Sequence, residues 1–490
     1  MGRRKKKKIL FVSAEVFPFA KVGGLADVAG SLPKSLLQMG CDVRIAMPRY
    51  KNIESEMKYI KDFPVEIGPR LETCIIKEGK IRFKNGNENK VIPVYFVDNH
   101  HYFNRQNVYS YYDDEYRFAF FCKAILEMLP EIDFKPDIIH CNDWHTGPIC
   151  MLLNEKYKEN AFYKDIKTLF TIHNLEYMGN FTKKTLTLFG MSEELFVPEK
   201  TEFYGMFNFI KTGLVYADAI NTVSETYSKE IQTHEYGERL EGLLKSRERD
   251  LFGILNGIDY EIFNPETDKY IYKNYNESTI NYKKENKYAL QKELGLPRKD
   301  VPVISLISRM AHQKGLDLVM DKIDEMMENE LQFIILGSGE KCYEKGFMEL
   351  KEKYPEKMAV YTGFNISLAH KIYAASDFFL MPSRFEPCGL GQMISFRYGT
   401  IPIVRETGGL AETVFDIEKN EEKGNGFSFK EFCAEDMMST IKRSIIFYNE
   451  NKEEWNRLVK NAMRMDFSWD RSAKKYMELY EKVIKKEKCI

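Results

Sequence analysis

The sequence predicts an α/β fold of two doubly wound domains, each with a parallel sheet covered by helices on both faces. At 490 residues the chain is too long for one hydrophobic core, so two or three domains are expected. Short apolar runs rich in β-branched residues alternate with longer amphipathic segments, which is typical of parallel strands buried on both faces. These runs form two series, one in each half of the chain, and two series predict two such domains.

The order of the apolar runs sets the predicted domain limits. In the first half, the predicted strands are residues 9–14, 43–47, 91–97, 138–141, 168–172 and 219–223. In the second half they are residues 303–307, 333–336, 358–361, 378–381 and 401–404, beyond a polar stretch at 266–287 that is typical of an exposed excursion. We therefore predict an N-terminal domain over residues 1–251 and a C-terminal domain over residues 252–466. Residues 467–490 should form a last helix, whose apolar stripe contains Tyr476, Leu479, Tyr480 and Val483.

The charge balance, the length of the apolar runs and the cysteine spacing exclude several classes of protein. Lys+Arg of 72 against Asp+Glu of 73 gives a net charge of −1, without the basic excess by which nucleic-acid binders neutralise phosphates. No run approaches the ~20 apolar residues needed to cross a bilayer, so neither nucleic acid nor membrane is expected as a partner. The nine cysteines lack the spacing of zinc or redox motifs, which indicates reduced thiols in a cytoplasmic protein. No metal and no cofactor are expected.

The beginning of the chain imitates a secretory signal, because a basic run at residues 3–8 precedes an apolar stretch at residues 9–20. Glu15 and Pro18 interrupt the apolar stretch, and cleavage near Ala20 would remove the first predicted strand. We expect a solvated basic tail that leads into a strand.

A glycine pair follows the first predicted strand, in the segment Lys21-Val22-Gly23-Gly24-Leu25. Two glycines at a strand-to-helix turn let backbone approach a ligand closely, and the amino end of the helix offers N–H groups to an anion. Lys21 would add a full positive charge beside them. A tight turn explains the glycines equally well, and the pattern is not the three-glycine dinucleotide fingerprint.

Further motifs lie at strand ends in the second half. Arg309 and Lys314 share the loop Ser308-Arg309-Met310-Ala311-His312-Gln313-Lys314-Gly315 and can converge on a diphosphate, although a solvated pair of surface charges is the alternative. Glu386 lies in Pro382-Ser383-Arg384-Phe385-Glu386-Pro387-Cys388-Gly389-Leu390, where a strand gives way to a loop and α/β proteins bind ligands. Thr407-Gly408-Gly409-Leu410 is a second glycine pair that suits phosphate or sugar oxygens.

Two polar motifs end strands in the first half. They are Asp143-Trp144-His145 and Thr171-Ile172-His173-Asn174. A lone histidine in such a place is more often a structural hydrogen-bonding group, and a packed tryptophan with a local cap would explain the other motif. The residues alone leave the roles of Asp143 and His173 open.

Together these motifs resemble the family of bacterial glycogen synthases and plant starch synthases over essentially the whole chain. The resemblance is carried by ordered blocks at residues 21–28, 143–145, 171–174, 202–211, 221–224, 255–259, 308–315, 382–390 and 407–410. So many ordered blocks across two domains are far more specific than any single motif.

The resemblance implies two Rossmann-like domains that face each other across a cleft, the GT-B arrangement, with a last helix that crosses back to the N-terminal domain. It implies transfer of glucose from ADP-glucose to the non-reducing end of an α-1,4-glucan, glycogen or a malto-oligosaccharide, with retention of configuration. The implied catalytic residues are Glu386, His173, Arg309 and Lys314. The implied substrate-binding residues are Lys21, Gly23, Gly24, Asp27, Asp143, Asn174, Asn256, Phe364, Cys388, Gly389, Leu390, Thr407, Gly408 and Gly409. Among them, Lys21 would bind the donor diphosphate with the two catalytic cations, and Phe364 would lie beside adenine.

One departure from the broader retaining glycosyltransferases is informative. Many of them carry a second glutamate eight residues after the first, and this chain has Ile394 there, as glycogen and starch synthases also lack that glutamate. The alternatives are a related retaining transferase that uses a UDP- or GDP-sugar, or a non-catalytic glucan-binding paralogue. A dinucleotide oxidoreductase is disfavoured because the three-glycine turn is missing.

Overall fold

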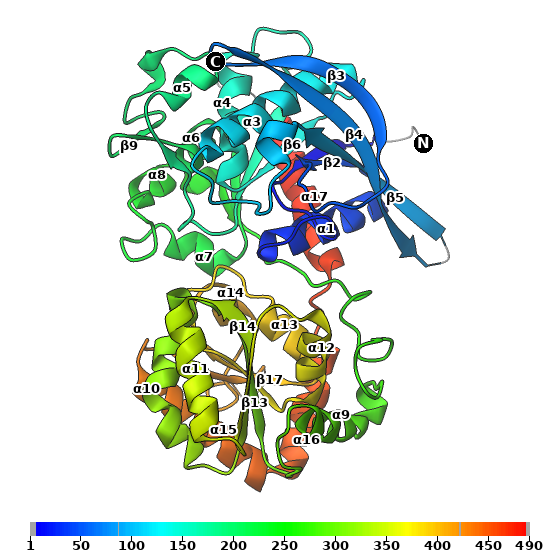
Figure 1. Ribbon diagram of the computed structural model, residues 1–490, viewed down its shortest axis with the longest axis vertical. Helices are drawn as coiled ribbons and strands as arrows, with labels where there is room; N and C mark the ends of the chain where they lie inside the picture. The colour runs from blue at the N-terminus through cyan, green and yellow to red at the C-terminus, as the bar shows by residue number, and fades with distance from the viewer. Residues whose placement is uncertain (1–5, 87, 421–422, 487–490) are drawn as a thin grey trace. The chain divides into compact units, whose positions relative to one another are not determined.

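The computed structural model describes residues 6–86, 88–420 and 423–486 (Figure 1). By backbone contacts the chain divides into two compact units. The first unit comprises Met1–Asn256 and Trp469–Ile490, and the second comprises Gly257–Ser468. These limits fall slightly after the predicted boundaries at 251 and 466. Each unit is an α/β structure with a parallel sheet, so the predicted fold class is confirmed.

The first unit is built on a nine-stranded sheet in the order β12-β11-β7-β6-β1-β2-β5-β4-β3. The strands from β12 to β5 are parallel, whereas β3 and β4 are antiparallel additions. The central strands β1, β6 and β7 are almost fully buried and mostly apolar, as expected when helices cover both faces. The strands are β1 (Lys8–Val12), β2 (Asp42–Pro48), β3 (Lys58–Ile67), β4 (Arg70–Asn85), β5 (Glu88–Asp98), β6 (Ile138–Asn142), β7 (Lys167–Ile172), β11 (Ala219–Thr222) and β12 (Leu251–Gly253).

The main helices of the first unit are α1 (Gly24–Gln38), α3 (Asp114–Glu131), α4 (Gly147–Glu155), α6 (Phe209–Tyr216) and α17 (Trp469–Lys485). Shorter helices are α2 (His100–Phe103), α5 (Thr185–Leu188), α7 (Glu225–Glu230) and α8 (Glu241–Ser246). A separate small sheet pairs β8 (Asn180–Phe181), β10 (Met206–Asn208) and β9 (Glu202–Phe203).

The second unit has a six-stranded parallel sheet in the order β15-β14-β13-β16-β17-β18. Its strands are β13 (Val303–Met310), β14 (Gln332–Gly339), β15 (Met358–Thr362), β16 (Phe378–Met381), β17 (Ile401–Arg405) and β18 (Phe427–Phe429). Its helices are α9 (Tyr282–Glu293), α10 (Leu316–Met327), α11 (Lys341–Lys353), α12 (Ile366–Ala375), α13 (Gly391–Arg397), α14 (Gly408–Thr413), α15 (Ala434–Glu450) and α16 (Lys452–Arg464).

Both sheets reverse their strand order at the first strand of the unit. β1 lies between β2 and β6, and β13 lies between β14 and β16. At such a switch point the loops that follow the two neighbouring strands leave in opposite directions and open a crevice at the carboxyl edge. The loops after β1 and β6, and after β13 and β16, are therefore the places where the fold itself offers a ligand site.

The last helix, α17, packs on the sheet of the first unit. Its apolar stripe is buried, and it includes the four residues predicted from the sequence. The Tyr480 hydroxyl lies 2.8 Å from His140 Nδ1 on β6, and the amide of Asn221 on β11 donates to the Tyr476 hydroxyl at 2.9 Å. Burial lowers the pKa of His140 well below its ordinary value, so this histidine is neutral in the core. The helix is thus joined to two strands by buried polar contacts as well as by apolar packing.

We expect Tyr480→Phe to destabilise the protein by about 1–3 kcal/mol, because it leaves a buried ring nitrogen of His140 without its partner. The control is Lys475→Ala on the same helix, whose ion pair with Glu225 is exposed and should contribute about 0–1 kcal/mol. Urea unfolding followed by circular dichroism measures both. Equal effects of the two substitutions would contradict a specific role of the buried hydroxyl.

Candidate functional site

In the second unit, Lys314 and Glu386 meet at the switch point. Lys314 ends a short turn between β13 and α10, and Glu386 lies in the loop between β16 and α13. The Lys314 ammonium lies 2.6 Å from Glu386 Oε2, and the Ser383 hydroxyl donates to the same oxygen at 3.0 Å. The side chains of Lys314 and Glu386 are 17% and 9% exposed. The structure therefore brings together two residues that lie 72 positions apart and that the sequence assigns to one site.

Gln313 connects Arg309 to the Glu386 loop. A terminal nitrogen of Arg309 donates to Gln313 Oε1 at 3.2 Å, and Gln313 Nε2 donates to the Phe385 carbonyl at 3.2 Å. The backbone N–H of Arg384 donates to the Gln313 carbonyl at 2.9 Å. Sequence reasoning missed this residue, although an amide between two cations on a ligand-binding loop is a signal for it. Gln313 fixes the spacing between the cationic loop and the acidic one.

The glycines at 408 and 409 are required by close packing of two backbones. A Cβ at Gly408 would lie 2.0 Å from the Glu386 carbonyl oxygen, and one at Gly409 would lie 2.1 Å from the Cys388 carbonyl oxygen. Gly408 also has a φ of +45°, and the N–H of Gly409 donates to the Glu386 carbonyl at 3.1 Å. The turn that begins at Thr407 therefore packs directly against the backbone of the loop that carries Glu386.

The remainder of the acidic loop leads into α13. Gly389 has a φ of +73°, and Leu390 is the last residue before the helix. The buried amide of Gln392 donates to the carbonyls of Cys388 and Gly389 at 3.1 and 3.0 Å. These bonds hold the backbone at 388–390 in one conformation beside Glu386.

Phe364 lies after the outer strand β15, at the same carboxyl edge of the sheet. Its side chain is 75% exposed, which is unusual for a large apolar residue. The preceding Gly363 is tied to the sheet by its N–H, which donates to the Gly337 carbonyl at 2.8 Å. The ring is therefore held at the edge without being part of the core.

In the first unit, Asp143 and His173 come together at the ends of β6 and β7. Asp143 Oδ1 accepts the backbone N–H of His173 at 2.7 Å, and the Asp143 N–H donates to the Thr171 carbonyl at 2.9 Å. Asp143 has a φ of +57°, a conformation that costs a non-glycine residue about 1–3 kcal/mol and is found most often at functional sites. Asn174 follows directly, and its Oδ1 accepts the Glu176 N–H at 3.1 Å.

Burial sets the protonation of both residues. Removal from solvent raises the pKa of Asp143 to about 7, and the nearby charge of Glu15 adds to the rise. Removal from solvent lowers the pKa of His173 to about 3, so its ring is neutral at neutral pH.

The tautomer of His173 follows from its neighbour. The Asn142 amide nitrogen donates to the Val12 and His140 carbonyls at 3.0 and 3.1 Å, so its Oδ1 is an acceptor. His173 Nε2, 2.9 Å from that oxygen, must carry the proton. Nδ1 of His173 therefore bears a lone pair that can accept a hydrogen bond from a ligand hydroxyl.

The Lys21 loop follows β1 at the switch point of the first unit. The Lys21 ammonium lies 2.7 Å from Asp27 Oδ1 on α1, and the two side chains are 33% and 25% exposed. No described atom lies within 4 Å of a Cβ built at Gly23, so the space above this residue is open to a close approach. The N–H groups of Val22 and Gly23, however, donate to the buried carboxylate of Glu15 at 2.5 and 2.9 Å. The sequence suggested no role for Glu15 beyond interrupting an apolar stretch.

Asn256 is the last residue of the first unit's main segment. It is buried, and its Oδ1 has no hydrogen-bond partner within the part of the chain that the structure describes. The predicted site residues thus form two sets, one at the carboxyl edge of each sheet. Within the described ranges no group of three His, Cys, Asp or Glu side chains could hold a metal ion.

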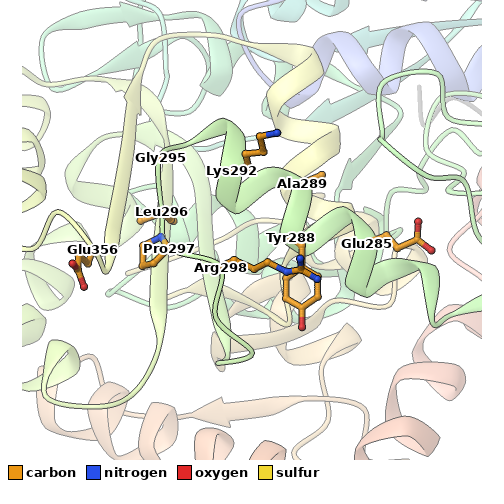
Figure 2. A pocket seen from close by; sticks show the side chains of 9 residues that line it. All are labelled: Glu285, Tyr288, Ala289, Lys292, Gly295, Leu296, Pro297, Arg298 and Glu356. Carbon is orange, nitrogen blue, oxygen red and sulfur yellow. The ribbon is translucent and has the colours of Figure 1, made fainter.

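A separate cavity of about 770 Å³ opens in the second unit between α9 and the segment that leads into β13 (Figure 2). Tyr288, Lys292 and Arg298 line it with Glu356, and the guanidinium of Arg298 covers the Tyr288 ring at 4.3 Å. Arg298 precedes β13 and Glu356 precedes β15, so the cavity lies at the amino ends of these strands. It is therefore on the edge opposite the loops at the switch point.

Comparisons with known proteins agree with this geometry. A family model described as the starch synthase catalytic domain matches residues 8–246, and one described as glycosyl transferases group 1 matches residues 289–465. The glycogen synthase of Desulforudis audaxviator is 52% identical over 98% of this chain and 97% of that protein. The glycogen synthase of Moorella thermoacetica is 52% identical over 99% of this chain and 98% of that protein.

Solved structures extend the comparison to the fold. The catalytic domain of starch synthase IV from Arabidopsis thaliana, bound to ADP and acarbose, superposes with a TM-score of 0.92. It is 34% identical and covers 98% of this chain and 100% of that one. A sucrose-phosphate synthase from Thermosynechococcus elongatus shares the fold, with a TM-score of 0.58 and 15% identity over 98% of this chain and 99% of that one.

The raised pKa of Asp143 predicts a pH-dependent stability. Between the ordinary pKa of 3.8 and about 7, the unfolded carboxyl ionises while the folded one keeps its proton, so the folded state loses stability as pH rises. Asp143→Asn keeps the acceptor for His173 and removes this titration. The stability of the native protein relative to the variant should therefore fall by about 2 kcal/mol between pH 5 and 8. Urea unfolding of both proteins across this range is the measurement, and parallel curves would contradict it.

Proposed function

Since the chain belongs to the glycogen and starch synthase family of glycosyltransferases, we propose that it transfers glucose from ADP-glucose to the non-reducing end of an α-1,4-glucan with retention of configuration. The observation that carries this proposal is the contact between Lys314 and Glu386 beside Arg309, at the switch point of the second unit. The Lys314 ammonium suits the anionic diphosphate of a sugar nucleotide, and the Glu386 carboxylate suits the hydroxyl groups of its sugar.

The cations stabilise the leaving group. When the bond between C1 of glucose and the phosphate oxygen breaks, its electron pair stays on the diphosphate, and positive charge develops on the sugar ring. Arg309 can grip phosphate oxygens as a fork and Lys314 as a point charge, so the negative charge is met by fixed donors. Lys21 of the first unit is proposed to serve the same diphosphate, and Gly23, Gly24 and Asp27, at the start of α1, are proposed to bind the donor beside it.

The sugar is held by groups that do not take part in bond making. Glu386 is proposed to accept hydrogen bonds from glucose hydroxyls, and the lone pair on His173 Nδ1 can accept another. Asp143, Asn174 and Asn256 are proposed to lie near the transferring sugar. The acceptor hydroxyl attacks C1 on the face from which ADP departs, and its proton passes to the released phosphate oxygen, so the configuration is kept.

The backbone around the acid is proposed to complete the donor pocket. Cys388, Gly389 and Leu390 present a fixed loop, and Thr407, Gly408 and Gly409 support it. ADP as the nucleotide is supported by the structure of starch synthase IV, which is bound to ADP and acarbose. No helix in the described ranges is long and apolar enough to cross a membrane. We propose a cytoplasmic location, because none of the eight cysteines that the structure describes forms a disulfide.

We expect Lys314→Met to reduce glucose transfer by 100-fold or more, since loss of one fixed donor at a developing anion costs about that factor. Glu386→Gln should reduce it by a similar factor, because the neutral amide removes both the charged acceptor for glucose hydroxyls and the partner of the Lys314 ammonium. The control is Lys345→Ala, which removes an ammonium that is 81% exposed in the same unit and should leave activity unchanged. The assay is incorporation of labelled glucose into glycogen from ADP-glucose and, separately, from UDP-glucose.

Two results would contradict the proposal. Near-normal transfer by both variants would remove Lys314 and Glu386 from the site. Faster transfer from UDP-glucose than from ADP-glucose by the native protein would favour the alternative, a related enzyme with another nucleotide.

Phe364→Ala should raise the KM for ADP-glucose about tenfold with little change in kcat, because stacking on a base contributes about 1–3 kcal/mol. The matched control is Ile366→Ala, another exposed apolar side chain two residues away, at the start of α12. Initial rates at varied ADP-glucose concentrations measure both. An unchanged KM for the Phe364 variant would exclude contact between this ring and the adenine.

A further inference from the structure

Glu15 is a buried carboxylate whose two oxygens are both occupied by hydrogen-bond donors. Its Oε2 accepts the backbone N–H groups of Val22 and Gly23 at 2.5 and 2.9 Å. Its Oε1 accepts the Tyr109 hydroxyl at 2.5 Å. The residue is only 4% exposed, so its charge is balanced by these protein groups and not by water.

The two amides lie next to the amino end of α1, where negative charge is favoured. Val22 and Gly23 directly precede α1, and N–H groups at the amino end of a helix favour negative charge. Glu15 fills this position with an anion supplied by the chain itself. A phosphate that approaches the loop therefore finds the ammonium of Lys21, which is one-third exposed, and not the amides of Val22 and Gly23.

We propose that Glu15 is a positioning residue, which fixes the loop at residues 21–24 through two backbone amides so that the Lys21 ammonium is presented to the donor diphosphate. The inference rests on the proposed function and adds a residue outside the motifs that resemble the family. Glu15 acts through Lys21 and does not touch the donor. Neither oxygen of Glu15 needs a ligand hydroxyl, because the described contacts already fill both.

A double-mutant cycle tests the dependence on Lys21. Lys21→Met should lower kcat/KM for ADP-glucose about 100-fold, as expected for the loss of one fixed donor. Glu15→Ala frees the loop and should lower the same constant at least tenfold. In the Lys21→Met background, Glu15→Ala should cause no more than about a threefold further loss, because two residues that act as one unit are non-additive.

Two further variants separate positioning from general stability. Glu15→Gln keeps an oxygen for the two amides and a polar group for Tyr109, so it should recover most of the activity lost in Glu15→Ala. Glu127→Ala is the matched control, because Glu127 is a partly buried glutamate of the same unit that contacts the Tyr157 hydroxyl at 3.4 Å, without a described bond to the loop. It should leave kcat/KM for ADP-glucose unchanged.

Amide hydrogen exchange gives a readout that does not need the reaction. In the native protein the amides of Val22 and Gly23 should exchange slowly, and Glu15→Ala should speed their exchange at least tenfold while β1 stays protected. Exchange measured by mass spectrometry on short peptides across residues 17–25 resolves this change.

Several outcomes would overturn the proposal. They are losses that multiply in the double mutant, a change confined to the KM for glucan, normal donor kinetics in Lys21→Met, and unchanged exchange in Glu15→Ala. Failure of the native protein to transfer glucose from ADP-glucose would instead contradict the proposed function. The exchange result would then still decide whether Glu15 anchors the loop.

Discussion

Both units depend on one topological constraint: the first strand of each sheet lies at its centre, with strands added on either side. In the first unit the loop after β1 therefore separates from the loop after β6, and in the second unit the loop after β13 separates from the loop after β16. Each pair of loops leaves room for a ligand. Every polar motif that the sequence places at a strand end lies at the carboxyl edge of a sheet, because each motif follows a strand that pairs in parallel with its neighbours. The mixed-charge cavity beside α9 is on the opposite edge, which is why its volume does not make it a candidate for the donor.

Each lysine of the candidate site contacts a carboxylate of its own unit. Lys21 contacts Asp27, and Lys314 contacts Glu386. The first pair is about one-third exposed, and such pairs contribute little net stability, so a diphosphate with several charges can compete for the ammonium at small cost. The second pair is nearly buried, and its acid is the group proposed to hold the sugar.

Several features of the fold followed from residue patterns, and the exceptions have physical reasons. The buried parallel strands were predictable because helices on both faces require almost continuous apolar runs. The long antiparallel strands β3 and β4 were missed, since their side chains alternate between exposed and buried and contain many charges. For the site, Lys314 and Glu386 could be proposed from their loops. Gln313 was missed although it lies between two cations on its loop, and Glu15 could not be proposed, because its contacts are with backbone amides that only the folded chain brings near.

The two glycine pairs look alike in the sequence but differ in their surroundings in the folded chain. Gly23 and Gly408 both open a pair at a strand-to-helix turn, and both pairs suggest a place for phosphate. At Gly408 a side chain would collide with the Glu386 carbonyl, so glycine is demanded by the protein's own packing. At Gly23 the described structure leaves the space empty, and φ is −141°, which any residue adopts. Nothing in the folding of the first unit requires glycine there. The Gly23 amide is bound by Glu15, and the backbone at Gly23 stays open to a close approach.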